Sequence, residues 1–186
     1  MSDSMITKQA IAQGFKNLMK EKNFDKITIS DITKTCGLNR QTFYYHFQDK
    51  YELLDWIYYN EAISVMMKDL NFDNWSDRIY EMLSVMKKEH YFYINAFKAS
   101  GRQEFEMYLF SVAKKLFRSV ILHLDSSDKM LEKDSEFIAS FFSYGVVGTI
   151  VSWTENGMRE TPEELKKHFE ILVLDSKELA VKRFLE

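Results

Sequence analysis

Apolar residues recur at helical spacing along most of the chain. Ile11, Phe15 and Leu18 stand at positions i, i+4 and i+7, which predicts an amphipathic helix over about residues 7–21. The same reasoning predicts two short helices within residues 28–47 and a longer one from about 49 to 69. Farther along, it predicts helices at about 75–89, 91–99, 102–123, 133–156 and 162–184.

Capping residues mark where the two short helices begin and end. Thr28 and Asp31 stand three residues apart, as in a capping box, at the start of the first one. Gly37 is placed to end that helix in a left-handed conformation, and Asn39 is a good N-cap for the second. A short helix, a glycine turn and a short helix form the arrangement of a helix-turn-helix, which reads DNA with its second helix.

Composition favours an all-α fold. The chain has one proline and six glycines in 186 residues, and both residue types are rare inside helices. We predict a helix-turn-helix domain in residues 1–50, a connecting helix at about 50–69 and a C-terminal helical domain in residues 51–186. The single cysteine, Cys36, excludes an internal disulfide and is expected in the core. The N-terminus lacks the features of a secretory signal, so we expect a cytoplasmic protein.

Charge is distributed unevenly between the two ends of the chain. The net charge is −3, but residues 1–50 contain eight basic and five acidic residues and so carry +3, which leaves −6 for the rest. A basic N-terminal part on an acidic remainder is typical of a protein that brings one end to phosphates.

The second short helix has an unusual outer surface. Phe43 and Phe47 share its inner face, which leaves arginine, glutamine, tyrosine and histidine side chains pointing elsewhere. Arg40 can bind a guanine edge and Gln41 an adenine edge, while aromatic side chains can contact phosphates or thymine methyl groups. Lys50 stands at the start of the next helix, where an ammonium group and free backbone amides both favour a phosphate.

Residues 27–32 and 37–54 resemble the DNA-binding domain of the TetR family. The most specific part is Thr-Phe-Tyr-Tyr-His-Phe at 42–47 followed by Lys-x-Glu-Leu-Leu at 50–54, and the resemblance covers roughly residues 6–60. It implies a sequence-specific regulator that binds a palindromic operator in double-stranded DNA. The implied DNA-binding residues are Thr28, Asn39, Arg40, Gln41, Thr42, Tyr44, Tyr45, His46 and Lys50.

The C-terminal part, from Phe141 through Leu165, is similar to the region in which members of this family form homodimers. Members pair through their last two long helices, and the stretch is most like regulators found near dihydroxyacetone kinase operons, some of which look like activators. The resemblance implies an interface that includes Phe142, Gly145, Gly148, Thr149, Ser152, Phe169 and Leu172.

The stretch from residue 137 to 154 contains no charged residue, and its 18 residues barely reach the length of a membrane span. Serine, threonine and tyrosine side chains within it, and the acids Glu136 and Glu155 that flank it, argue against a membrane. Burial on two sides, against its own domain and against a second subunit, is the better explanation.

Aromatic residues in the C-terminal part suggest a pocket for a small-molecule effector, although most are expected in the core. The candidates are Tyr93, Phe97, Tyr108, Phe141 and Tyr144. We expect a repressor that a small molecule releases. The alternative is an activator whose C-terminal domain is switched by a protein partner, such as a kinase-like subunit.

The sequence offers no motif for catalysis, a cofactor or a metal. It has no glycine-rich phosphate loop and no Gly-x-Ser-x-Gly, and its four histidines do not stand at ligand spacing. We therefore expect neither an enzyme nor a protein that requires a cofactor.

Overall fold

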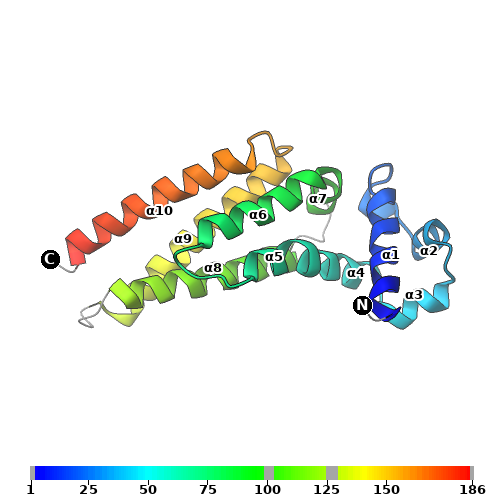
Figure 1. Ribbon diagram of the computed structural model, residues 1–186, viewed down its shortest axis with the longest axis horizontal. Coiled ribbons are helices and arrows are strands. Elements are labelled where there is room, and N and C mark those ends of the chain that lie inside the picture. Colours follow the sequence, from blue (N-terminus) through cyan, green and yellow to red (C-terminus); the bar gives the residue numbers. More distant parts are fainter. Residues whose placement is uncertain (1–2, 99–102, 125–129, 185–186) are drawn as a thin grey trace.

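The computed structural model describes residues 3–98, 103–124 and 130–184, with residues 124 and 177–184 described by their backbone alone. These residues contain helices, turns and loops, and no strand. Three helices form a head at one end, next to the N-terminus, and the later helices form an elongated body that ends at the C-terminus (Figure 1).

The head (residues 3–48) consists of α1 (Asp3–Leu18), α2 (Ile29–Cys36) and α3 (Arg40–His46), with a 3₁₀ turn at Phe24–Lys26. A connecting stretch follows as α4 (Lys50–Ile57), a π-helical segment (Tyr58–Ile63) and α5 (Ser64–Met67). The body contains α6 (Trp75–Lys88), α7 (His90–Lys98), α8 (Gln103–Leu124), α9 (Glu132–Glu155) and α10 (Pro162–Phe184).

The predicted caps of the short helices are confirmed. The Thr28 hydroxyl accepts from the Asp31 backbone N–H at 3.2 Å, and the Asp31 carboxylate accepts from the Thr28 N–H at 3.0 Å. Gly37 has φ +67°, the left-handed conformation that glycine adopts without strain. Asn39 accepts from the Thr42 N–H at 2.8 Å. Local hydrogen bonding therefore sets the start of α2 and α3.

Two predicted helices differ in detail. The first spans Asp3–Leu18 rather than about 7–21. The predicted connecting helix is not a single α-helix, because a π-helical segment at Tyr58–Ile63 interrupts it and α5 ends at Met67. A π turn holds an extra residue, so it rotates the side chains that follow it around the helix axis. Tyr58 and Ile63 are buried there, while the Glu61 carboxylate reaches Lys16 of α1.

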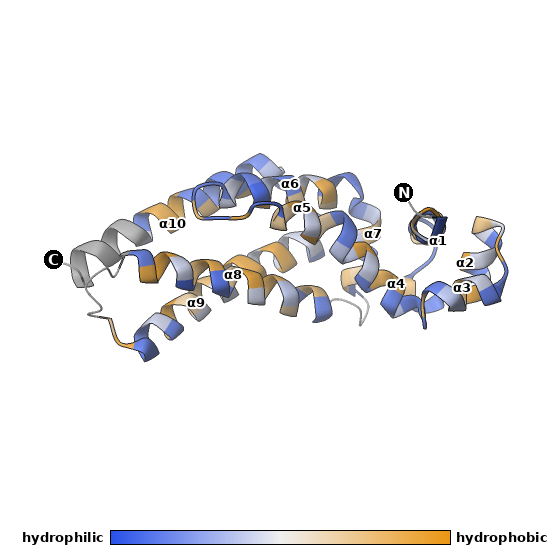
Figure 2. Ribbon diagram, turned by 60° about the horizontal axis from the view of Figure 1, so that its bottom comes forward, coloured by the Kyte–Doolittle hydropathy of each residue, from blue (hydrophilic) through white to orange (hydrophobic). Residues whose placement is uncertain are grey.

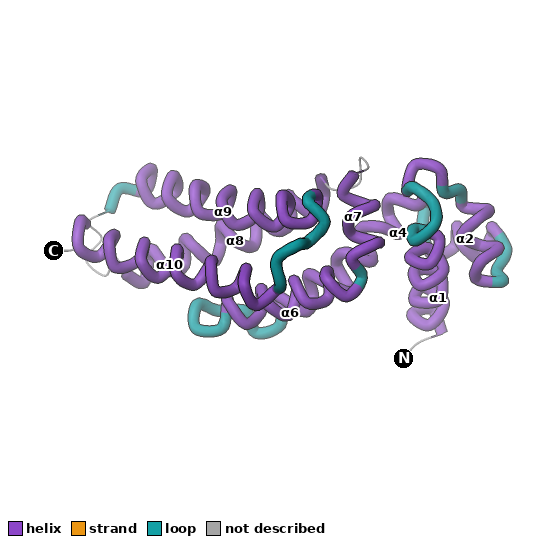
Figure 3. Tube along the Cα trace, turned by 90° about the horizontal axis from the view of Figure 1, so that it is seen from above, coloured by secondary structure: helices purple, strands orange, loops and turns teal. Residues whose placement is uncertain are grey.

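The body is built from helices that run along its length. In the view from above, α8, α9 and α10 follow the long axis (Figure 3), with α8 packed against α9, α6 against α10 and α7 against α9. Apolar segments recur along these helices (Figure 2), as expected for helices with a buried stripe. One hydrophobic core continues from the head through the body.

Close packing of α1 against α2 explains a glycine inside α1. A Cβ atom on Gly14 would lie 2.3 Å from the Cys36 sulfur, which leaves no room for a larger residue there. Cys36 was expected in the core but is only half-buried. Its thiol donates weakly to the Ala10 carbonyl, with 3.4 Å between sulfur and oxygen. Burial raises the pKa of this thiol above its usual value.

Candidate nucleic-acid interface

The head presents the outer surface of α3 to solvent. Phe43 and Phe47 are buried in the head core, so the opposite side of α3 faces outward. Tyr45 is 82% exposed and Tyr44 49% exposed, which is unusual for large aromatic side chains without a partner surface. Asn39, Arg40 and Gln41 are exposed as well, and Thr42 and His46 are half-exposed. The structure thus brings the predicted α3 residues together on one surface.

Arg40 and Tyr44 interact one turn apart on that surface. A guanidinium nitrogen of Arg40 donates to the Tyr44 hydroxyl at 3.4 Å, and the guanidinium carbon lies 6.0 Å from the centre of the Tyr44 ring. This contact restricts the arginine side chain before any ligand arrives. A restrained arginine loses less entropy when it binds a planar, bidentate partner such as a guanine edge.

Thr28 lies at the N-terminus of α2, but its hydroxyl is already used in the helix cap. It donates to the Asp31 carboxylate at 2.9 Å and accepts from the Asp31 N–H. Hydrogen bonds from Thr28 and Lys22 lower the pKa of Asp31 to about 2, so this carboxylate is ionised at neutral pH. A fixed negative charge beside Thr28 weakens the case for a phosphate contact at this residue.

Lys50 occupies a different place from the one that the sequence suggested. Its ammonium group donates to the carbonyls of Phe24, Ile27 and Asp25 at 2.9, 3.0 and 3.1 Å, and it lies 4.6 Å from the centre of the Phe24 ring. All three ammonium protons are therefore directed at the chain itself. Lys50 thus holds the 3₁₀ turn before α2 against the start of α4, and the phosphate contact suggested by the sequence stays a prediction for the DNA complex.

The five predicted effector residues do not meet in one cavity. Tyr93 and Phe97 are fully buried in the core around α7, and Tyr108 lines open grooves beside α8. Phe141 and Tyr144 are about two-thirds exposed on α9. Aromatic content alone did not distinguish core, groove and outer surface, because all three use the same residue types.

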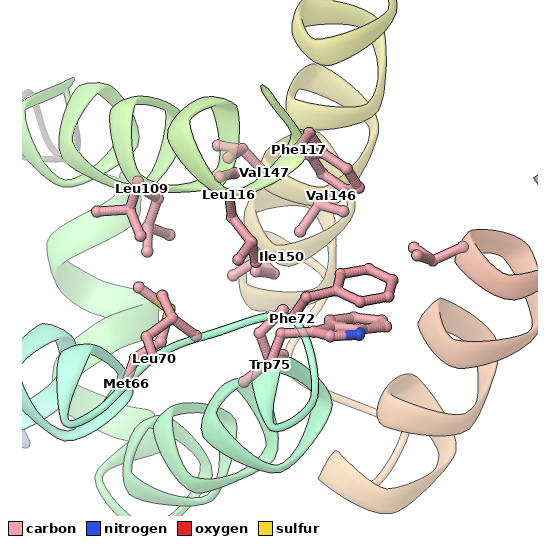
Figure 4. A pocket seen from close by; sticks show the side chains of 14 residues that line it. Met66, Leu70, Phe72, Trp75, Leu109, Leu116, Phe117, Val146, Val147 and Ile150 are labelled. Atoms are coloured by element: carbon pink, nitrogen blue, oxygen red, sulfur yellow. The ribbon is translucent and has the colours of Figure 1, made fainter. Parts of the chain in front are cut away.

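The body instead encloses a small apolar cavity between α5, α6, α8, α9 and α10 (Figure 4). Its volume is about 40 Å³, and no charged side chain lines it. The lining residues are Met66, Leu70, Phe72, Trp75, Ile79, Leu109, Val112, Ala113, Leu116, Phe117, Val146, Val147, Ile150 and Val173. The sequence pattern does not reveal this cavity, because aliphatic residues at helical spacing are typical of any core helix.

The predicted interface residues lie mostly on the outer face of α9 and α10. Gly145, Gly148, Thr149 and Ser152 are exposed along α9, and Leu172 is 63% exposed on α10. Phe142 is half-buried against Phe117, with 5.4 Å between ring centres. Phe169 is the exception, because it is only 5% exposed and packs in the core of its own chain.

The outer face of α9 and α10 is also rich in large apolar side chains. We define it as the outer apolar face, made by Phe137, Phe141, Tyr144, Gly145, Gly148, Thr149, Ser152, Ile171, Leu172 and Leu174. α9 is long and apolar enough to cross a membrane by length and composition, and 39% of that apolar stretch is buried inside the chain. Across the described residues, His, Cys, Asp and Glu side chains form no group of three or more that could hold a metal ion.

A helix-turn-helix head with an exposed reading helix, joined to a helical body, defines a class of DNA-binding regulators. The sequence model of bacterial regulatory proteins of the tetR family matches residues 13–57, and that of a transcriptional regulator C-terminal region, also a TetR model, matches residues 73–175. The chain belongs to the TetR family and is a transcriptional regulator. Regulators of this family are soluble proteins that bind DNA and dimerise.

Known relatives include two described as DhaS. The chain is 34% identical over 97 residues to the "HTH-type dhaKLM operon transcriptional activator DhaS" of Lactococcus lactis subsp. lactis (strain IL1403), which covers 52% of each chain. The match thus spans about half the length of that relative. A solved structure, "Dihydroxyacetone kinase operon activator DhaS", superposes with a TM-score of 0.74 and 25% identity, covering 94% of this chain and 98% of the other.

A more distant structure shares the fold. A regulator from Pseudomonas aeruginosa PAO1 superposes with a TM-score of 0.66 and 15% identity, and covers 95% of this chain and 93% of that one. This match shows the fold alone, while the matches to the two DhaS proteins confirm the resemblance to regulators of dihydroxyacetone kinase operons.

Replacing Lys50 separates a structural role from a DNA contact. Lys50→Met should lower the free energy of unfolding by about 1–3 kcal/mol, because three carbonyls lose a charged donor. Urea denaturation measures this, with Lys34→Met, an exposed lysine on α2, as the matched control that changes stability little. The structural role is refuted if the free energy of unfolding is unchanged and the slope of log affinity against log salt concentration falls by the amount of about one phosphate contact.

Proposed function

We propose that this protein is a homodimer that reads a palindromic operator with α3 of each subunit and is controlled through its body. The observation that carries this proposal is the outer surface of α3, where exposed Arg40, Gln41, Tyr44 and Tyr45 stand over a buried Phe43. Two large aromatic side chains exposed on one helix are typical of a surface that a partner covers. The helix-turn-helix domain predicted for residues 1–50, the connecting helix at about 50–69 and the C-terminal domain of residues 51–186 would then be the reading, linking and sensing parts.

We assign base contacts and phosphate contacts to different residues of α3. Arg40 and Gln41 lie at the N-terminal end of α3, the part of a recognition helix that reaches base edges. Tyr44, Tyr45, His46 and Thr42 follow, and hydroxyl and imidazole groups are suited to phosphates. Asn39 completes the set while also capping α3, and Thr28 belongs to it only through its position at the N-terminus of α2, because its hydroxyl is bound to Asp31.

The outer apolar face supports dimerisation through α9 and α10. It exposes the large aromatic side chains of Phe137, Phe141 and Tyr144, which are 71%, 65% and 68% exposed. Gly145 and Gly148 place no side chain on this face, and a Cβ atom at either would meet nothing within 4 Å. Helices from a second copy can therefore approach closely and form a two-fold bundle. Such a dimer holds two α3 helices for half-sites roughly 34–36 Å apart.

The apolar cavity supports control by a small, uncharged, apolar effector. Hydrophobic burial is the main attraction that such a lining offers, since it has no charged group to bind a polar molecule. About 40 Å³ is little room, so a larger ligand must move the surrounding helices apart. Met66 of α5 lines the cavity, and α5 leads through α4 to the head. We infer repression that the effector releases, in a cytoplasmic protein with access to DNA.

Activation through a protein partner is the second candidate. The name of the Lactococcus lactis relative describes an activator, and the cavity is small for a drug-sized ligand. A partner, such as a kinase-like subunit, would then bind the body and change the geometry of the dimer. The two candidates share the DNA-binding head and differ in what controls it.

Selection from a random DNA pool tests the proposed function. At a fixed salt concentration, the purified protein should enrich a palindrome with half-sites about one helical turn apart. Arg40→Ala should bind that palindrome about 1–3 kcal/mol more weakly and lose preference at one base pair of each half-site. An enriched pool without sequence preference would contradict the proposal, and equal weakening by Arg40→Ala on all sequences would make Arg40 a phosphate contact.

A charge on the outer apolar face tests the dimer. Gly148→Glu should weaken self-association by roughly 100-fold or more, because the interface would bury an unpaired carboxylate. The monomer tolerates the side chain, since a Cβ atom there meets nothing within 4 Å. Sedimentation equilibrium measures the association, with Ser119→Glu, an exposed position on α8, as the control. A dimer of unchanged affinity in Gly148→Glu would remove α9 from the interface.

Filling the cavity distinguishes the small-molecule candidate from the protein partner. Toluene, which needs the helices around the cavity to move apart, serves as an apolar probe. It should raise the melting temperature of the wild-type protein, because a ligand that binds only the folded state stabilises that state. Ala113→Leu should abolish this rise by occupying the cavity. If toluene shifts the melting of both proteins equally, the cavity is not its site, and control by a protein partner becomes the better candidate.

A further inference from the structure

One side chain of the body, Asn95 of α7, holds the end of the first helix of the head. Its amide oxygen accepts from the Phe24 N–H at 3.0 Å, and its amide nitrogen donates to the carbonyls of Met19 and Lys22 at 2.8 and 2.7 Å. Both polar atoms of one amide are thus used, with the oxygen facing a donor and the nitrogen facing two acceptors.

The three backbone groups lie where α1 ends and the 3₁₀ turn begins. Backbone N–H groups of residues 19–22 bind the last carbonyls of α1, whereas the Met19 and Lys22 carbonyls lie just beyond the helix. A residue more than 70 positions later in the chain supplies the donor for both of them. Asn95 therefore ties the turn that follows α1 to the body.

A second contact joins the same two parts through charge. The Lys16 ammonium of α1 is bound by the Glu61 carboxylate, with oxygens at 2.7 and 3.0 Å, and lies 3.9 Å from a Glu89 oxygen. Lys16 is only 5% exposed, so its charge depends on these partners. Glu61 lies in the π-helical segment and Glu89 directly before α7.

These contacts give the head two attachments to the body. One is covalent and runs through α4, and the other runs to α7 through Asn95 and through the approach of Lys16 to Glu89, directly before α7. A head attached to the body at one point can pivot about that point, whereas a head attached at two points has a defined orientation. α7 also packs against α9, which carries the outer apolar face. The second attachment thus links the end of α1 to the helix proposed at the dimer interface.

We propose that Asn95 is a positioning residue that sets the distance and direction of the reading helices in the dimer. This inference rests on the proposed function, because it concerns how two heads match two half-sites. Asn95 contacts no base or phosphate in this role. It acts through α1, whose place in the head core determines where α3 stands.

The test compares binding to palindromes of different spacing. Each inserted base pair moves one half-site by about 3.4 Å and turns it by about 34°, so a rigid pair of heads prefers one spacing sharply. Affinities are measured for the wild-type protein, Asn95→Ala and Asn95→Asp on the selected palindrome and on the same half-sites with one base pair added or removed. Asn95→Asp keeps the volume of the side chain but turns a carboxylate oxygen toward two carbonyls.

A matched control removes a similar amide within the body. Asn74, half-buried before α6, accepts from the Asn71 N–H at 2.9 Å and donates to the Asp69 carbonyl at 2.8 Å. Asn74→Ala loses comparable hydrogen bonds without touching the head. The measured quantity is the ratio of affinities for the best and the altered spacing, which does not depend on the fraction of active protein.

Both Asn95 variants should lower this ratio by about fivefold or more, the lower range of couplings between separate sites, while Asn74→Ala leaves it unchanged. An unchanged ratio in Asn95→Ala and Asn95→Asp, with all affinities weakened equally, would overturn the inference, because it means a purely structural loss. A wild-type protein that binds DNA without any preferred spacing would overturn the proposed dimeric function itself, and the inference with it.

Discussion

A continuous apolar contact between head and body is the interaction on which the rest of the structure depends. Phe15 of α1 lies edge-on to Phe24 at 5.9 Å and to Phe92 of α7 at 6.3 Å, and Phe92 reaches Tyr58 at 6.0 Å. All four rings are buried. Burial of each aromatic side chain of this kind stabilises the folded state by roughly 1.5–3 kcal/mol. The head is therefore packed against the body and not joined to it by α4 alone. The direction in which α3 points follows from this contact.

Apolar contact is not directional, so polar groups determine how the two parts are oriented. The Asn95 amide and the Lys16 ammonium each have one arrangement in which their hydrogen bonds are made, and both sit at the rim of the aromatic cluster. Moving the head along the body would leave a buried cation and several backbone groups without partners, which is costly. Lys50 fixes the turn between α1 and α2 from the other side of the head.

The body uses its apolar residues in three different settings. Aromatic rings fill the core at α7, aliphatic side chains line the small cavity, and aromatic rings again cover the outer apolar face. An α9 helix that is apolar nearly all round serves two of these settings, with Val146, Val147 and Ile150 inward and Phe141 and Tyr144 outward. In the proposed dimer, a change in the cavity therefore acts on the same helix that carries the interface.

The sequence by itself determined the helices, their caps and the family, because these depend on neighbours a few residues apart. Thr28 with Asp31, Gly37, and the spacing of Phe43 and Phe47 already specify a short helix, a turn and a reading helix with an outward polar surface. Only the tertiary structure decided what distant groups do. The Lys50 ammonium meets carbonyls more than 20 residues away, and Phe169 turns inward. Asn95 holds the turn after α1, and mainly aliphatic residues enclose the cavity. Hydrogen-bond partners and cavities come from packing between segments, and the helical period carries no information about which segments meet.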